Sequence, residues 1–222
     1  MLSPTPDVRR PEPRWPVIVA AFSAVALHFT LPETLRVGPP WVLAIAVGIL
    51  VVVAQLFRSA GRHRENSWTG YLVLALLAGG LLYGLGALLL GLVRHSESAT
   101  SLLRSAAVLW LTNVIVFASW YWRLDAGGPN ERERREAHTS GAFLFPQMSL
   151  SAPSDSSTSL AEDIGWRPSF VDYLFLAFNT STALSPTDVP VLSSWAKLTM
   201  MLQSLISLTT IVLLAGRAVN LL

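Results

Sequence analysis

The sequence contains no cysteine among its 222 residues. This absence excludes disulfide bonds, thiolate metal sites and cysteine nucleophiles. Charge is also scarce, because only 14% of the residues are Asp, Glu, Lys or Arg, against about 25% in an ordinary soluble domain. Hydrophobic residues make up 52% of the chain. Together these values indicate a membrane protein whose main partner is the lipid bilayer.

Enzyme signatures are absent as well. The sequence has no His-Glu-x-x-His, no Gly-x-Ser-x-Gly and no phosphate-cradling glycine loop. We therefore expect no enzyme activity, no metal site and no cofactor. The net charge of +2 is small and the basic residues lie in loops, so the sequence does not predict nucleic acid binding.

Long apolar runs predict an all-α integral membrane protein with five transmembrane helices. The predicted spans cover residues 16–31, 41–57, 68–93, 102–122 and 195–222. Tryptophans near several of their ends suit the headgroup layer. We therefore expect a multi-pass protein of the cell membrane.

The chain divides into three predicted parts. Residues 1–14 hold four prolines and three arginines, which predicts a disordered basic N-terminus. Residues 15–101 form a three-helix membrane region, and residues 102–222 form a second region that contains a polar connection over 124–166. We expect this connection to be flexible, except for the apolar segment 141–148, which should dock on the membrane surface or on the protein itself.

A short helix is predicted over 170–182. Ser169 and Asp172 have the spacing of a capping box and follow Pro168, which disfavours helix before it. At about 1.5 Å per residue this helix is too short for a hydrocarbon core of about 30 Å. It either lies in the interface or enters the membrane and turns back, and its polar end favours re-entry. A turn over 183–194 then leads into the last span.

This part of the chain resembles the pore module of the potassium-channel superfamily. The resemblance consists of an outer helix, this half-helix, a threonine-containing turn that ends in aspartate, and an inner helix. That family's turn reads Thr-Thr-Val-Gly-Tyr-Gly-Asp. Here Thr182 and Asp188 match its first and last residues, and Ser185, Pro186 and Thr187 stand in place of Gly-Tyr-Gly. The run from 170 to 188 is also similar to an uncharacterised family of bacterial multi-pass membrane proteins.

The pore-module resemblance implies passive conduction of a monovalent cation or another small solute along the axis of a homo-tetramer, through a filter without Gly-Tyr-Gly. The filter candidates are Thr180, Ser181, Thr182, Ser185, Pro186, Thr187 and Asp188. Their oxygens either coordinate a hydrated cation or satisfy the broken helix end. Asp188 is either a functional carboxylate in the membrane or an exposed loop residue.

Two amides lie at predicted membrane depth, Asn113 in the fourth span and Gln203 in the last. They either form interhelical hydrogen bonds or line a water path. Two alternative functions stay open: a non-conducting membrane scaffold or partner subunit, and a small transporter. Arginine counts place the N-terminus in the cytoplasm, whereas the pore-module resemblance implies the reverse orientation.

Overall fold

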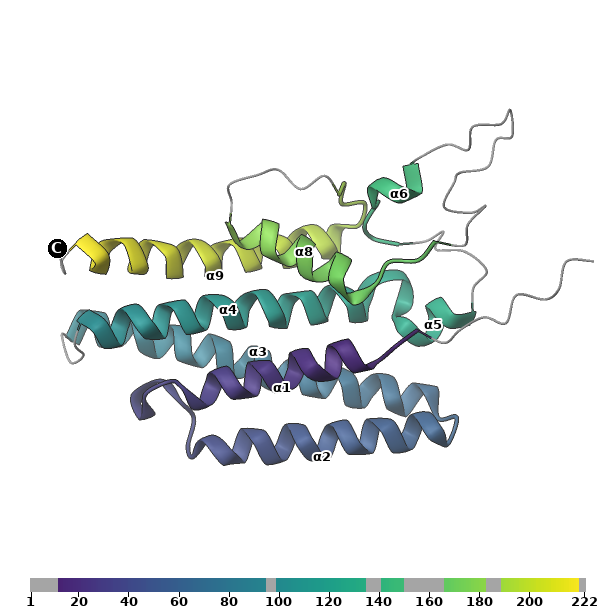
Figure 1. Ribbon diagram of the computed structural model, residues 1–222, viewed down its shortest axis with the longest axis horizontal. Helices are drawn as coiled ribbons and strands as arrows, with labels where there is room; N and C mark the ends of the chain where they lie inside the picture. The colour runs from purple at the N-terminus through teal and green to yellow at the C-terminus, as the bar shows by residue number, and fades with distance from the viewer. Residues whose placement is uncertain (1–11, 95–98, 135–140, 150–165, 183–188, 220–222) are drawn as a thin grey trace, which may run out of the picture.

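The computed structural model describes residues 12–94, 99–134, 141–149, 166–182 and 189–219 (Figure 1). These residues form helices and one isolated antiparallel β-bridge, between Phe143 and Val191. The predicted all-α class is confirmed. The α-helices are α1 (Trp15–Phe29), α2 (Pro40–Ser59), α3 (His63–Arg94), α4 (Ala99–Leu124), α5 (Pro129–Arg134), α6 (Pro146–Ser149), α8 (Phe170–Thr182) and α9 (Ser194–Val219), and the short 3₁₀ helices are η1 (Glu33–Leu35) and η2 (Asp125–Gly127).

Four of these helices, α2, α3, α4 and α9, are long and apolar enough to cross a membrane. The first predicted span forms α1, which is apolar but has only 15 residues. Its length is therefore about 22 Å, short of the roughly 30 Å hydrocarbon core. The structure is thus an all-helical bundle with four candidate spans and one shorter apolar helix.

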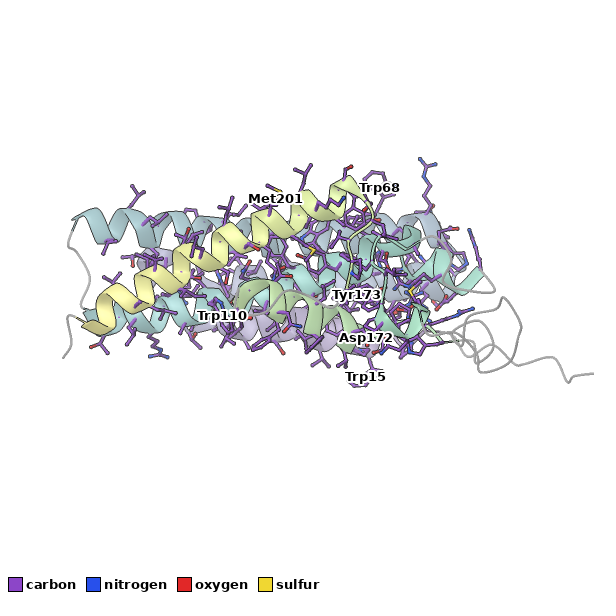
Figure 2. The ribbon with its side chains drawn as sticks, turned by 90° about the horizontal axis from the view of Figure 1, so that it is seen from above. Trp15, Trp68, Trp110, Asp172, Tyr173 and Met201 are labelled. Atoms are coloured by element: carbon purple, nitrogen blue, oxygen red, sulfur yellow. The ribbon has the colours of Figure 1, made fainter. Side chains whose placement is uncertain are left out.

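The long helices lie side by side and alternate in direction along the chain from α1 to α4 (Figure 1). Helices α1, α3, α8 and α9 all begin at one end of the bundle, which we call the entry end. Helices α2 and α4 finish there. Trp15 and Trp68 are about two-thirds exposed at this end, as expected for residues of the headgroup layer (Figure 2).

Helix α8 begins at Phe170, as the capping box predicts. The Asp172 carboxylate accepts hydrogen bonds from the Ser169 backbone N–H (2.7 Å) and hydroxyl (2.8 Å). The helix packs against α4 and α9. It points in the same direction as α9 and ends part of the way along it (Figure 1).

The apolar segment 141–148 docks on the protein. Phe143 and Phe145 are buried, and the Phe143 ring packs edge-on against Tyr121, Tyr173 and Trp195. Backbone hydrogen bonds join Leu144 N–H to the Pro190 carbonyl and Leu192 N–H to the Ala142 carbonyl. This segment therefore fixes the chain just before α9. The structure describes the rest of the predicted flexible connection only at residues 124–134, 149 and 166. Residues 124–134 pack at the end of α4. Residues 1–11 of the predicted N-terminus lie outside the described part.

A sharp turn after α4 depends on glycine. Gly128 has a φ of +89°, and a Cβ at this position would lie 2.7 Å from the Arg123 carbonyl oxygen. A side chain there meets both an unfavourable backbone conformation and a rigid backbone atom.

We predict that Gly128→Ala lowers the free energy of unfolding by at least about 1–2 kcal/mol, because alanine in this left-handed region is strained and its Cβ collides with the backbone. Gly48→Ala is the matched control, since Gly48 lies in α2 with open space around it. That change should be neutral or slightly stabilising. Unfolding by SDS titration in mixed micelles measures both, and equal stability of the two variants would contradict this account of the turn.

Candidate functional site

The last turn of α8 ends inside the bundle, where its carbonyl groups need partners. An α-helix leaves its last four carbonyls without partners of its own. The Ser181 carbonyl accepts hydrogen bonds from the Ser207 hydroxyl and, at 3.4 Å, from the Trp110 indole N–H. The Thr180 carbonyl accepts from the Ser204 hydroxyl at 3.4 Å. Side chains of α4 and α9 thus bond two of the last carbonyls of α8.

Gln203 joins three helices at this point. It is fully buried, and its amide N–H groups donate to the Ala177 carbonyl and to the Ser181 hydroxyl, each at 2.7 Å. Its side-chain oxygen accepts a hydrogen bond from the Tyr121 hydroxyl on α4. A buried amide with both ends bonded fixes the rotation of α9 against α4 and α8.

Asn113 completes the arrangement from α4. Its side chain is fully buried and donates to the Gln203 backbone carbonyl at 3.2 Å and to the Ser181 hydroxyl at 3.5 Å. Its Oδ1 has no hydrogen-bond partner among the described residues. We call the side chains that surround the last turns of α8 the cap cluster, which consists of Trp110, Asn113, Tyr121, Gln203, Ser204 and Ser207.

The structure brings together three of the residues singled out from the sequence, Asn113, Ser181 and Gln203. Both amides make interhelical hydrogen bonds. Thr180 and Thr182 bond carbonyls of their own helix, at 2.8 Å and 3.1 Å. The remaining filter candidates, which lie outside the described residues, are Ser185, Pro186, Thr187 and Asp188.

Sequence reasoning missed the contributions of Trp110, Tyr121, Ser204 and Ser207. One signal was available, because Gln203, Ser207 and Thr210 recur at the i, i+4, i+7 spacing of a single helix face. All three are buried. Figure 2 shows Asp172 and Trp110 at opposite ends of α8, with Met201 on the outer side of α9.

A second buried polar cluster lies at the entry end and was also missed. The Arg132 guanidinium donates to the Trp122 and Asp125 carbonyls, each at 2.8 Å, and pairs with Glu12 at 2.8 Å. The Asp125 carboxylate accepts from the Ala142 backbone N–H at 2.5 Å and from the Tyr173 hydroxyl at 2.7 Å. Arg132 and Asp125 are both buried. This entry-end cluster ties the start of α8 to the end of α4.

We predict that Tyr121→Phe lowers the free energy of unfolding by about 1–2 kcal/mol, because it leaves the buried Gln203 oxygen without a donor. Tyr83→Phe is the matched control, since Tyr83 is 48% exposed on α3. It should change stability by less than about 0.5 kcal/mol. Equal effects in an SDS unfolding titration would show that the cluster does not hold α9 in place.

Gln203→Leu removes the central member of the cap cluster. We predict a loss of unfolding free energy of at least about 2 kcal/mol, because the Tyr121 hydroxyl loses its buried acceptor and the Ser181 hydroxyl loses the shorter of its two hydrogen bonds. The double variant with Tyr121→Phe should be less destabilised than the sum of the two single variants. If the losses of unfolding free energy of the two single variants add up to that of the double variant, Gln203 and Tyr121 are not directly coupled.

Within the described ranges, no three His, Asp or Glu side chains are grouped so as to hold a metal ion. Comparisons with models of protein families, with curated proteins and with solved structures give no match. The geometry around α8 is therefore the basis for the functional conclusion.

Proposed function

We propose that this chain is a subunit of a cell membrane channel, which passively conducts a cation or small solute through a pore formed by four copies. The arrangement of α4, α8 and α9 as outer helix, half-helix and inner helix supports this function. The turn that matches the pore module at Thr182 and Asp188 supports it as well.

One observation carries the proposal: α8 stops beside the middle of α9 although both helices begin at the entry end (Figure 1). Gln203, which bonds Ser181 near the end of α8, is the tenth residue of α9 and lies about 14 Å along it. The chain must return from Thr182 to the start of α9 at Ser194. This return path supports the proposal that α8 and the turn after it enter and leave the membrane on one face.

The electrostatics of α8 suit a cation. A helix C-terminus carries a partial negative charge of about half an elementary charge, and here it points along α9, away from the entry end (Figure 1). The segment that follows, 183–188, contains four of the seven filter candidates and ends in Asp188. Carboxylates and carbonyls near such a helix end lower the free energy of a cation at membrane depth.

Four copies are proposed because one chain supplies one half-helix and one inner helix, which cannot enclose a symmetric path alone. The number four comes from the resemblance. Arg58 and Arg64, at the entry end, favour a cytoplasmic location for that end and for the N-terminus. On this proposal α8 enters from the cytoplasmic face, opposite to potassium channels.

A second candidate, a non-conducting scaffold or partner subunit, is favoured by a different observation. The hydrogen bonds of the cap cluster close within one subunit. The large exposed side chains of α9 are all apolar over 198–212: Leu198, Met201, Leu202, Leu205, Leu208 and Val212. Such a face packs against lipid or another helix and offers no oxygen to an ion.

Ion flux through liposomes containing the purified chain separates the two candidates. We predict K⁺ or Na⁺ flux above that of empty vesicles. Asp188→Asn should reduce this flux about tenfold, because loss of an attracting carboxylate raises the entry barrier by about 1.4 kcal/mol. Glu33→Gln is the matched control, since this exposed carboxylate follows α1 at the opposite end.

Absence of K⁺, Na⁺ and Cl⁻ flux, with no effect of Asp188→Asn, would exclude conduction and favour the scaffold. Flux that saturates and requires a co-substrate would instead identify a transporter. In every case the ion flux through Glu33→Gln should equal the flux through the unmodified chain.

A further inference from the structure

A cavity of about 80 Å³ lies between α1, α2, α3 and the end of α4, at the entry end. None of its lining residues belongs to the cap cluster. Arginines line one part of it: Arg14, Arg58 and Arg123. Aliphatic side chains line another part, among them Val17, Ala21, Val51 and Val73. The cavity is therefore amphiphilic, with positive charge beside a hydrocarbon surface.

Arg14 has more hydrogen-bonding capacity than the protein uses. Its side chain is 8% exposed, and its Nη2 donates to Asn130 at 3.0 Å and pairs with Glu133 at 2.9 Å. Its Nε and Nη1 are buried and have no hydrogen-bond partner among the described residues. Burial lowers the pKa of Arg14 to about 10, although Glu133 and Glu12 oppose the shift, so the guanidinium stays charged at neutral pH. Buried charged donors without an acceptor are unfavourable and point to a missing anion.

The charges around the cavity do not balance. Glu133 is the carboxylate that pairs with both Arg14 and Arg58, at 2.9 Å and 3.7 Å. Arg123 donates to two neutral acceptors, the Asn66 and Ser67 carbonyls, at 2.6 Å and 2.9 Å. With the adjacent Arg132 and its carboxylate neighbours Glu12 and Asp125 included, four guanidinium groups and three carboxylates leave an excess of one positive charge. An anion that reaches this cavity meets both an electrostatic attraction and free donors.

The apolar side of the cavity selects for a particular class of anion. Val17 and Ala21 come from α1, and Val51 comes from α2, a helix in which Val47 is the one buried residue. Gln55, an exposed polar side chain of α2, also lines the cavity. An inorganic anion cannot use the aliphatic surface, whereas a headgroup with an attached chain uses both parts. Basic pockets between membrane helices are suited to anionic headgroups.

We propose that this cavity binds one anionic amphiphile, with its phosphate or carboxylate headgroup at Arg14 and Arg58 and its acyl chain against Val17, Ala21 and Val51. The volume is below the roughly 300–1,000 Å³ of a typical small-molecule pocket. The cavity therefore receives the headgroup and the first methylene groups, and the rest of the chain lies in the bilayer. This site does not depend on conduction.

Native mass spectrometry of the full chain in detergent tests the site with four probes. These probes are dipalmitoyl-phosphatidylglycerol, dipalmitoyl-phosphatidylcholine, palmitate and glycerol 3-phosphate. We expect one anionic amphiphile to bind per chain at least about tenfold more tightly than the zwitterionic lipid, as charge-assisted hydrogen bonds imply. Phosphatidylglycerol binding identifies a phospholipid as the source, and binding of palmitate alone identifies a fatty acid; either result supports the site.

Two variants and one control locate the bound molecule. Arg14→Gln should weaken binding about tenfold by removing the unpaired donors. Ala54→Phe should do the same by filling the cavity, which Ala54 lines, without changing any charge. Arg64→Gln should have no effect, because Arg64 is exposed at the same end and does not line the cavity.

Thermal unfolding of each variant confirms that it is folded, and Ala54→Phe decides the question if Arg14→Gln does not fold. The proposal would be overturned if phosphatidylcholine bound as tightly as phosphatidylglycerol and palmitate. It would also be overturned if glycerol 3-phosphate bound as tightly as these amphiphiles. Binding of the anionic amphiphiles that survives Ala54→Phe would also overturn it, because the molecule would then lie elsewhere.

Discussion

The packing of the bundle depends on the hydrogen bonds that the carbonyl groups at the end of α8 accept away from water. A helix that ends inside a protein leaves its last carbonyl groups without intrahelical partners, and each buried carbonyl left unpaired is unfavourable by roughly 1–3 kcal/mol. Here Ser204, Ser207 and Trp110 bond the Thr180 and Ser181 carbonyls, while Gln203 bonds the Ala177 carbonyl. Each bond also specifies the depth and rotation of a neighbouring helix. The cap cluster therefore makes a short helix possible and sets the packing of α4 and α9 around it.

The start of α8 is fixed as firmly as its end. Asp172 caps the first turn, and Tyr173 in the same turn donates to the buried Asp125 at the end of α4. Asp125 also bonds the backbone at Ala142, which places the Phe143 segment against the approach to α9. With both ends held, α8 has one position and one direction in the bundle. The proposed channel function requires this property of a helix that leads into a filter.

Sequence signals within a few residues of each other predicted where helices form. They did not predict which side chains of different helices contact one another. Pro168, Ser169 and Asp172 predicted the start of α8, because capping chemistry is encoded within a few residues. The convergence of Asn113, Ser181 and Gln203 could not be predicted, since it depends on how three helices rotate and cross. The buried pairs of Arg132 were missed because a mixed run of charges over 131–136 is typical of a solvated connection. One partner, Glu12, lies 120 residues away in the sequence, and another is the backbone carbonyl of Asp125, which no side-chain pattern predicts.

On the proposed function, α8 enters the membrane and the chain returns to the same face. Depth measurement by EPR power saturation tests it directly, because the chain has no native cysteine and single spin labels are simple to place. Val171, Phe178 and Leu192 are all exposed and serve as label sites. The account predicts a label at 178 about 10 Å deeper than one at 171, with the label at 192 returning to the face of 171. Equal depths at 171 and 178, or a label at 192 on the opposite face, would contradict it.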